Sequence, residues 1–313
     1  MTMSADAVEV DLVAHLDANR WSTYQKMIVA LAALAFASDG IANQLIGIAM
    51  PALLGEWQVG RAEMAPVAAL GLFGVMLGSA AGGMVCDRIG RRLALIGAIT
   101  LFSVMNMLTA LTQNVPMLEF VRFLAGLGIG AAIPSGAALI TGVTPRRSRA
   151  LALALGMMFV GGGGFLAGLL GAAIMPAFGW RALFLVSGLG ALAVALLFLF
   201  VLPESPGFLA QKHGRHRLIT IFFARCGHPV EDHWVFFEMS AEGEQKAGLL
   251  TLFRPPYLSQ TIGIWLGFFC CLLASYTMFS WLPTMLSTQD FSLRDTSLFM
   301  SVYHGGAIFG GLL

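Results

Sequence analysis

Long apolar runs separated by short polar stretches dominate the pattern along the chain. A helix needs about 20 apolar residues to cross a hydrocarbon core about 30 Å thick. Seven complete runs of this kind are present, at 27–50, 65–86, 93–111, 117–140, 150–177, 183–202 and 262–285. An eighth begins near Ser297 and stays apolar to Leu313, so we interpret the chain as ending inside a helix.

One extended polar stretch, 203–260, divides six predicted spans from the rest. Six helices, a polar linker and further helices indicate two bundles, the second of them cut short. We predict an all-α, polytopic membrane protein with four parts: an N-terminal segment at 1–25, a six-helix bundle at 26–202, a central loop at 203–260, and about two helices of a second bundle at 261–313. Within the first part, Val8, Leu12 and Leu16 recur every four residues and predict a short amphipathic helix on the membrane surface.

The composition agrees with a bilayer location. Hydrophobic residues make up 58% of the 313 residues and charged residues 11%, whereas a soluble chain carries about 25% charged residues. The formal net charge of +1 excludes the basic field that nucleic-acid binding needs. Four cysteines show no paired framework, so we predict no disulfides.

The distribution of basic residues predicts the orientation. Cytoplasmic loops retain Lys and Arg, and fourteen of the 18 basic residues fall at one set of alternate loops, against three at the other set. The remaining one, Arg122, lies inside a predicted helix. We therefore predict that the N-terminus and the central loop are cytoplasmic.

A short loop between the second and third runs carries one acid and three bases. It reads Gly83-x-x-x-Asp87-Arg88-x-Gly90-Arg91-Arg92. We expect Gly83 to let one helix pack closely on a neighbour, Asp87 to cap the next helix, and the arginines to complement the negative helix end. The pattern resembles the loop signature of the major facilitator superfamily. The resemblance implies a fold of two helical bundles and a role for these six residues in a cytoplasmic gate.

Arg122 lies in the fourth run, followed by Gly126, Gly128 and Gly130, which is similar to a second pattern of the superfamily. An arginine in hydrocarbon costs at least ~2.5 kcal/mol, so we expect it to face a cavity, an anion or an acid. It lies about five residues from the outer end of its run, and snorkelling to the surface is the structural alternative. In the fifth run, glycines at 161–164, 168 and 171 predict close approach to neighbouring helices.

Asp39 is the thirteenth of 24 residues in the first run, which places it at the bilayer midplane. Asn43 shares its helix face, and Gln44 lies toward the flank. A protonatable carboxylate beside an amide is what a proton-coupled carrier needs. The alternative is a structural aspartate paired with Arg122 or with a backbone group.

Two residues of the second bundle are further candidates. His304 lies in the eighth run and is a candidate proton relay, because its unperturbed pKa is near 6.5; a hydrogen bond across the bundle is the alternative. Tyr276 ends a stripe with Trp265, Phe269 and Leu272. This stripe predicts either a surface that stacks an aromatic ring or packing and lipid contact.

These features together resemble the aromatic acid:proton symporter family within the superfamily. The resemblance rests on Asp39-Gly40, on PALLGEW at 51–57, on PESPGFL at 203–209 and on WLPT at 281–284. It implies import of small organic anions, namely aromatic carboxylates such as hydroxybenzoates, by proton symport across the inner (plasma) membrane. One departure matters, because that family has a second aspartate where this chain has Ala42.

The departure keeps other hypotheses open. Ala42 favours an uncoupled facilitator of sugar-like molecules or organic ions, or a different proton site such as His304. A third hypothesis is a fragment that does not transport by itself.

An intramembrane hydrolase using Ser135 and His304 lacks the expected glycine before the serine. A metal site is only weakly indicated by the spacing of Cys226, His228 and His233. We expect no catalytic residue, metal or cofactor, and a monomer whose partners are the bilayer, protons and the organic anion.

Overall fold

The computed structural model describes residues 8–210, 216–228, 230, 234–237, 253–255, 257–289 and 291–310. The elements in chain order are β1 (Val8–Asp11), α1 (Leu12–Ala18), α2 (Thr23–Trp57), α3 (Arg61–Ile89), α4 (Arg91–Thr109), α5 (Val115–Val143), α6 (Arg146–Val201), α7 (Pro206–Ala210), α8 (His216–Cys226), β2 (Trp234–Phe237), α9 (Tyr257–Ser287) and α10 (Leu293–Gly310). Six of these helices, α2 to α6 and α9, are long and apolar enough to cross a membrane. The predicted helical membrane fold is confirmed.

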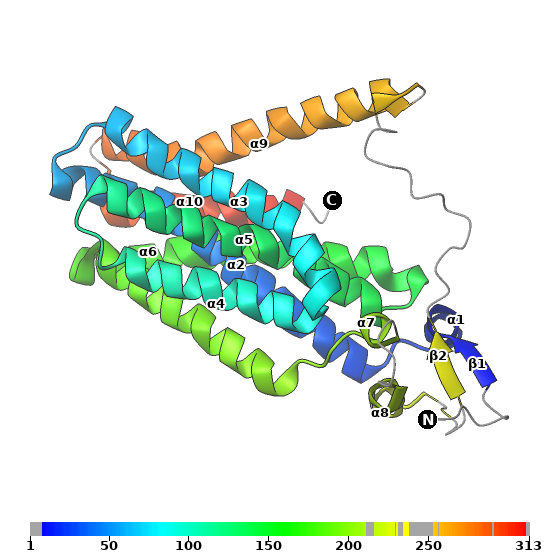
Figure 1. Cartoon of the computed structure of the whole chain (residues 1–313). Helices are drawn as coiled ribbons and strands as arrows, with labels where there is room; N and C mark the ends of the chain where they lie inside the picture. The colour runs from blue at the N-terminus through cyan, green and yellow to red at the C-terminus, as the bar shows by residue number, and fades with distance from the viewer. Residues whose placement is uncertain are drawn as a thin grey trace.

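The long helices run side by side in one bundle. Helix α3 packs on α5, α2 packs on α6, and α4 packs on both α5 and α6. Helix α10 lies against α6, and α9 lies along the outside near α2 (Figure 1). The short elements α1, α7, α8, β1 and β2 gather at one end, together with the start of α2. We call this end, where the α3–α4 and α5–α6 loops also lie, the basic end of the bundle.

Helix α6 joins the predicted fifth and sixth runs without a loop. Its 56 residues contain one non-helical residue, Gly179, with φ 76° and ψ 178°. A residue with a Cβ is strained at such a positive φ, so glycine permits the sharp turn between two spans. At the turn, the Glu56 carboxylate accepts hydrogen bonds from Trp180 Nε1 at 2.6 Å and from Arg181 Nη1 at 2.5 Å. These bonds hold the turn against the end of α2.

Polar caps set the helix starts. The hydroxyl of Ser22 accepts from the Gln25 amide nitrogen, and the Gln25 side chain accepts from the Ser22 amide nitrogen, which together form a capping box for α2. The same Gln25 side chain donates to the Val143 carbonyl at 2.8 Å and ties α2 to the end of α5. Helix α10 begins at Leu293, four residues before the predicted start, because the Ser292 hydroxyl accepts from the Asp295 amide nitrogen.

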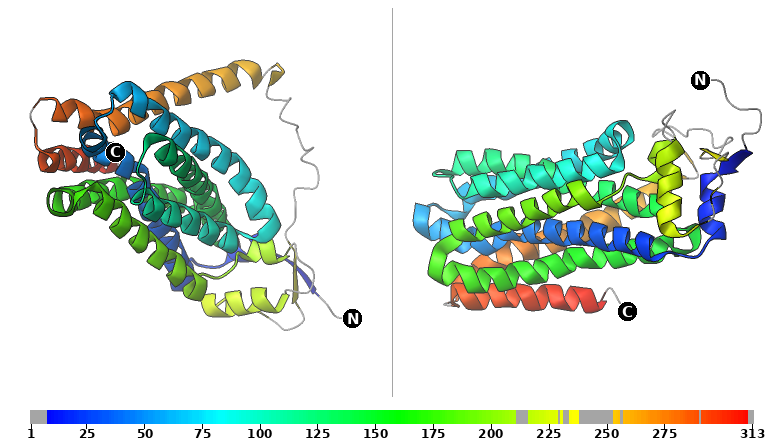
Figure 2. Two further views of the ribbon diagram at one scale, coloured as in Figure 1. Left: turned by 60° about the vertical axis from the view of Figure 1, so that its left-hand side comes forward. Right: turned by 90° about the horizontal axis from the view of Figure 1, so that it is seen from below.

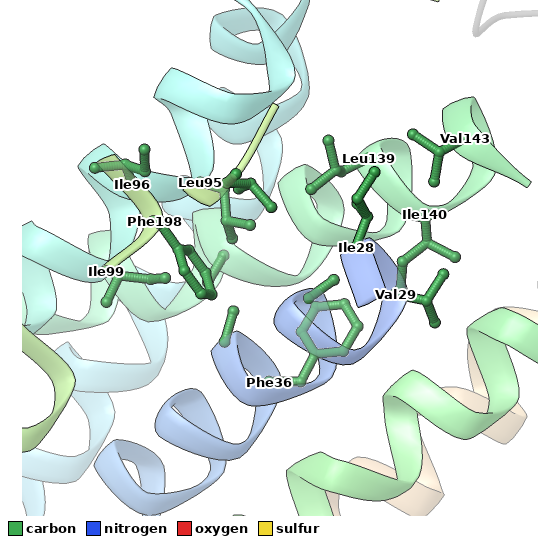
Figure 3. Packing of buried hydrophobic residues seen from close by; sticks show 14 of the residues in the cluster. Ile28, Val29, Phe36, Leu95, Ile96, Ile99, Leu139, Ile140, Val143 and Phe198 are labelled. Atoms are coloured by element: carbon green, nitrogen blue, oxygen red, sulfur yellow. The ribbon is translucent and has the colours of Figure 1, made fainter. Parts of the chain in front are cut away.

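A buried apolar cluster fills the bundle near the basic end (Figure 3). Side chains from α2, α4, α5 and α6 meet there. Its labelled members are Ile28, Val29, Phe36, Leu95, Ile96, Ile99, Leu139, Ile140, Val143 and Phe198. Because lipid tails are as apolar as leucine, such contacts stabilise a membrane bundle through close packing rather than through removal from water.

Glycines bring two helices of the bundle into backbone contact. A Cβ placed on Gly74 or Gly78 of α3 would collide with the backbone of Phe123 or Leu127 in α5. Gly83 does not take part, since a Cβ there would meet nothing within 4 Å. The prediction that Gly83 enables close packing is therefore wrong, and the helix makes its close approach through Gly74, Gly78 and the neighbouring Gly82, which meets Ala131 of α5.

The N-terminal segment also departs from the prediction. Residues 8–11 form β1 rather than the first turns of a helix, and β1 pairs in parallel with β2 of the central loop, Val8 opposite Trp234. Helix α1 begins only at Leu12, where the Asp11 carboxylate accepts from the Val13 amide nitrogen. The pairing joins the start of the chain to the loop that follows the first six spans, a long-range contact that helical periodicity does not reveal.

Candidate functional site

Asp39 lies in the middle of α2 with only 1% of its surface exposed. Neither of its carboxylate oxygens has a hydrogen-bond partner among the described residues. A carboxyl group in this position is costly to keep charged, and intramembrane acids of this kind mark ion and proton pathways. The structural alternative, a pair between Asp39 and Arg122, is not observed within the described part of the chain.

Arg122 is buried in α5 with 4% of its surface exposed, so it does not snorkel to the surface. Its Nη1 donates to the Asn106 side-chain oxygen of α4 at 3.1 Å. The guanidinium carbon lies 6.0 Å from the centre of the Phe184 ring of α6, within the range of a weak cation–π contact. A neutral amide and a ring leave the positive charge of Arg122 without a balancing acid among these contacts.

Arg122 borders a small cavity of about 30 Å³ between α2, α3 and α5. Asn43 of α2 and Tyr276 of α9 line the same cavity, so residues from both predicted bundles meet there. The prediction that Arg122 faces a cavity is thus met. The volume has room for water, and it is too small for an aromatic acid.

A larger cavity of about 460 Å³ lies on the other side of Asn43. Gln44, Met157 and His304 line it, together with Gly161 of α6. The volume falls in the range of small-molecule sites, which is about 300–1,000 Å³. Asn43 therefore lines both the cavity beside Arg122 and the cavity beside His304.

The position of His304 depends on the glycines of α6. A Cβ at Gly164 would collide with the His304 ring, and one at Gly168 would collide with Ser301 of α10. Gly163 in turn allows α6 to meet the backbone of α2 at Ala37. The predicted close approach is confirmed at Gly163, Gly164, Gly168 and Gly171 and is not found at Gly162, and the first four form a glycine face of α6 between α2 and α10.

The aromatic stripe of α9 does not line a site as a whole. Trp265 and Phe269 expose 58% and 63% of their surfaces, and Leu272 is also exposed. Only Tyr276 of this stripe lines a cavity. The exposure of the other three residues agrees with the alternative of lipid contact, because helical periodicity alone does not show which part of a face meets another helix.

The loop between α3 and α4 forms a hydrogen-bonded network with the segment after α6. Arg91 Nη1 donates to the Ser205 hydroxyl at 2.8 Å. The amide nitrogens of Arg92 and Ser205 donate to Glu204 Oε1 at 3.1 and 2.9 Å. Gly90 has φ 107°, and a Cβ there would collide with Glu204. The loop motif at 83–92 and the PESPGFL motif at 203–209 therefore contact each other in the fold.

Glu204, and not Asp87, caps the start of α4. Asp87 lies inside α3, is exposed, and gives no cap to α4, whose N-cap is Gly90. The predicted capping role of Asp87 is wrong, because α3 continues to Ile89 and leaves a single residue between the helices. Glu204 was missed as a functional residue, although the PESP motif that contains it had been noted.

The weak metal and hydrolase hypotheses gain no support from the described residues. Burial raises the pKa of the Cys226 thiol, which disfavours the thiolate that binds metals. His228 Nε2 lies 3.1 Å from the Arg20 carbonyl, and His233 falls outside the described residues. Ser135 lines a cavity with α3 and α4 residues, and His304 lines a different one.

A membrane bundle that holds a buried acid, together with a buried arginine and amides that line cavities between its helices, has the features of a secondary transporter. Residues 32–313 match the Major Facilitator Superfamily, and the chain belongs to this family of membrane transporters. The family resemblance noted in the sequence is confirmed.

Two curated relatives are similar along nearly the whole chain. The 4-hydroxybenzoate transporter PcaK of Pseudomonas aeruginosa is 33% identical over 99% of this chain and 69% of its own length. The gallate transporter of Pseudomonas putida is 30% identical over 97% of this chain and 68% of its own length. The chain therefore spans about two thirds of the length of these relatives.

A solved structure shows the same fold. The xylose transporter XylE from E. coli, in a partially occluded inward open conformation, superimposes with a TM-score of 0.71 at 18% identity. The similarity covers 92% of this chain and 69% of the XylE chain. It supports the assignment of the helical arrangement, and at this identity it says nothing of the substrate.

Proposed function

We propose that this protein imports small aromatic carboxylates, such as hydroxybenzoates, by proton symport. The observation that carries the proposal is the unbalanced positive charge of Arg122 beside a cavity that residues of α2, α3, α5 and α9 line. The named substrates of the relatives, 4-hydroxybenzoate and gallate, are aromatic rings that bear a carboxylate. A buried guanidinium attracts a carboxylate, and apolar walls accept the ring.

In this mechanism the ring enters the larger cavity, near Met157 and His304, and Asn43 and Gln44 donate hydrogen bonds to its polar groups. Arg122 attracts the carboxylate from the adjoining cavity, where Tyr276 supplies a further polar contact. Asp39 takes and releases the proton, because its carboxyl oxygens have no other hydrogen-bond partner among the described residues. His304 is the second candidate for proton transfer.

The basic end of the bundle is proposed to face the cytoplasm, with the N-terminus on the same side and the chain in the inner membrane. Gly83, Asp87, Arg88, Gly90, Arg91 and Arg92 then form the cytoplasmic gate. In the conformation described, Arg91 and Arg92 are held to the segment after α6 by the contacts with Ser205 and Glu204. Opening and closing would exchange these hydrogen bonds.

The test is uptake of radiolabelled 4-hydroxybenzoate by cells that express the chain, alone and with any coding sequence that follows Leu313. Proton symport predicts that a protonophore abolishes accumulation. It also predicts that Asp39→Asn abolishes accumulation but keeps counterflow, in which internal unlabelled substrate exchanges for external label without net proton movement. Asp295→Asn is the matched control, since Asp295 is exposed at the start of α10.

An uncoupled facilitator is the second candidate, and Ala42 favours it. This residue is buried where the resembling family has a second acid. Uptake that neither the protonophore nor Asp39→Asn changes would support this candidate and contradict symport. Absence of uptake in every arm would contradict both candidates for the expressed chain.

A further inference from the structure

Helix α8 lies across the direction of the bundle helices at the basic end (Figure 2, right). Its buried face consists of Ile219, Phe222, Phe223 and Cys226, which pack toward α2 and the aromatic residues of the small sheet. A helix that runs across the bundle axis at its end lies parallel to the membrane surface. Its outer face is therefore placed where the headgroups of the bilayer lie.

The outer face of α8 has the composition of an interfacial helix. Leu218 and Ile221 expose 48% and 42% of their surfaces, and Arg217 and Arg225 are exposed beside them. Apolar residues bordered by arginines suit the boundary between acyl chains and anionic headgroups. Leu218 also continues the lipid-facing surface of the bundle, because it lines a pocket with Ile89 and Leu93, both of which are half exposed.

This pocket has a volume of about 320 Å³ and contains two guanidinium groups. Arg88 is exposed and makes no hydrogen bond or ion pair with any residue that the structure describes. Arg92 donates through Nη2 to the Leu199 carbonyl, and its buried Nε has no hydrogen-bond partner in the described ranges. Glu204 is the acid of the pocket, and one of its oxygens is already occupied by two backbone amides.

We propose that α8 and this pocket bind the headgroup of an anionic phospholipid. Arg88 and Arg92 contact the phosphate, since guanidinium groups match its geometry. Leu218, Ile89 and Leu93 contact the start of the acyl chains. Arg217 meets further anionic headgroups along the surface, whereas Arg225 donates to the Tyr24 hydroxyl at 3.3 Å and links α8 to α2. The occupant is a lipid and not a soluble phosphate, because the apolar wall of the pocket is continuous with the surface that faces the hydrocarbon.

The first experiment is native mass spectrometry of the purified chain with phosphatidylglycerol and phosphatidylcholine of identical acyl chains. We expect at least about five-fold preferential retention of phosphatidylglycerol. Combined Arg88→Gln and Arg217→Gln should remove the preference. Combined Arg61→Gln and Arg294→Gln removes the same charge from the starts of α3 and α10 and should leave the preference intact.

Equal retention of the two lipids by the unaltered chain would overturn the proposal. So would an unchanged preference in the Arg88 and Arg217 variant. Displacement of phosphatidylglycerol by millimolar glycerol phosphate would identify a site for soluble anions instead. Circular dichroism of each variant checks that the helices remain folded.

A second measurement keeps the native arginines. Leu218→Cys, in a chain with Cys270→Ser and Cys271→Ser, is labelled with bimane and placed in vesicles containing a lipid with a nitroxide near its headgroup. We expect strong quenching at this position and weak quenching for Leu189→Cys, an exposed position near the middle of the last span of α6. Equal quenching at the two positions would contradict the placement of α8 at the headgroups.

Discussion

The basic end and the centre of the bundle differ in how far their polar groups are hydrogen-bonded. At the basic end, Arg91 donates to the Ser205 hydroxyl and Glu204 accepts from two backbone amides, at 2.8–3.1 Å, and among these side chains only the Arg92 Nε is buried without a partner in the described residues. At the centre, the carboxylate of Asp39 has no such partner among the described residues, and Arg122 has a neutral amide. Buried polar groups that are hydrogen-bonded stabilise one conformation. Buried polar groups without a partner remain available to bind a proton or a ligand. Substitutions at the two places should therefore have different consequences.

The largest effect is expected at the centre. Arg122→Gln should lower 4-hydroxybenzoate uptake by about 10- to 150-fold, because a hydrogen bond to a charged group contributes about 1.5–3 kcal/mol. Uptake at a fixed amount of protein in the membrane is the measurement. Arg61→Gln, at the exposed start of α3, is the control, and equal losses in both variants would show that the position of Arg122 has no special role.

The close approach of α3 and α5 gives the next largest effect, on stability. Gly78→Ala places a Cβ against the backbone of Leu127 and should lower the free energy of unfolding by about 1–3 kcal/mol. Gly83→Ala is the matched control in the same helix, since its Cβ meets nothing within 4 Å. Thermal unfolding in detergent measures both, and a control that loses as much would contradict the packing argument.

At the basic end, Gly90→Ala should destabilise the chain by about 1–2 kcal/mol. The reason is the backbone of Gly90, whose φ of 107° and ψ of 154° lie in a region that L residues adopt at a cost of this order, together with the collision between its Cβ and Glu204. Gly97→Ala in α4 meets no atom within 4 Å and serves as the comparison. Similar midpoints for the two variants in thermal unfolding would refute the prediction.

Removal of the α4 cap should have a smaller effect. Glu204→Ala deletes the acceptor for the Arg92 amide, and loss of a cap costs about 0.5–2 kcal/mol. Asp87→Ala should cost less, because the structure gives this exposed side chain no capping contact. Thermal unfolding distinguishes them, and a larger loss for Asp87→Ala would restore the capping role that the sequence suggested.

The smallest effect is expected at the opposite end. Glu56→Gln weakens the exposed pair with Arg181, and such pairs contribute about 0–1 kcal/mol. The hydrogen bond from Trp180 to the side chain remains possible with the amide oxygen. A thermal midpoint within about 2 °C of the unaltered chain is expected, and a large shift would show that the turn at Gly179 depends on this charge.

Apolar periodicity predicted most of the fold because a membrane helix must be continuously apolar for about 20 residues. The predicted spans match observed helices to within two residues at their ends: 93–111 runs two residues past α4, 183–202 runs one residue past α6, and the others lie inside a helix. The start of α10 was misplaced because a cap made by Ser292 and Asp295 extends the helix beyond its apolar part. The strand at Val8–Asp11 was missed because its partner, β2, is more than 200 residues away in the sequence.

The site was predicted less completely. The sequence identified Asp39, Arg122 and Asn43 because a polar residue in an apolar run is conspicuous. It did not show that Asn43 borders two cavities, or that Glu204 meets Arg92, because these relations depend on how helices distant in sequence pack. At Gly83 the sequence predicted a close helix contact that is absent, because a glycine in a motif does not by itself indicate a contact.

The glycine face of α6 has a consequence for motion. Where α10 meets Gly164, Gly168 and Gly171, its His304, Ser301 and Ser297 rest on a surface without side chains. Helices that interdigitate side chains must change rotamers to shift past one another, and a surface of backbone alone has no ridges to unlock. Rotamer changes that accompany a shift of α10 along this face are therefore confined to α10, and the hydrogen bond from the Ser301 hydroxyl to the Phe165 carbonyl is a contact that such a shift breaks.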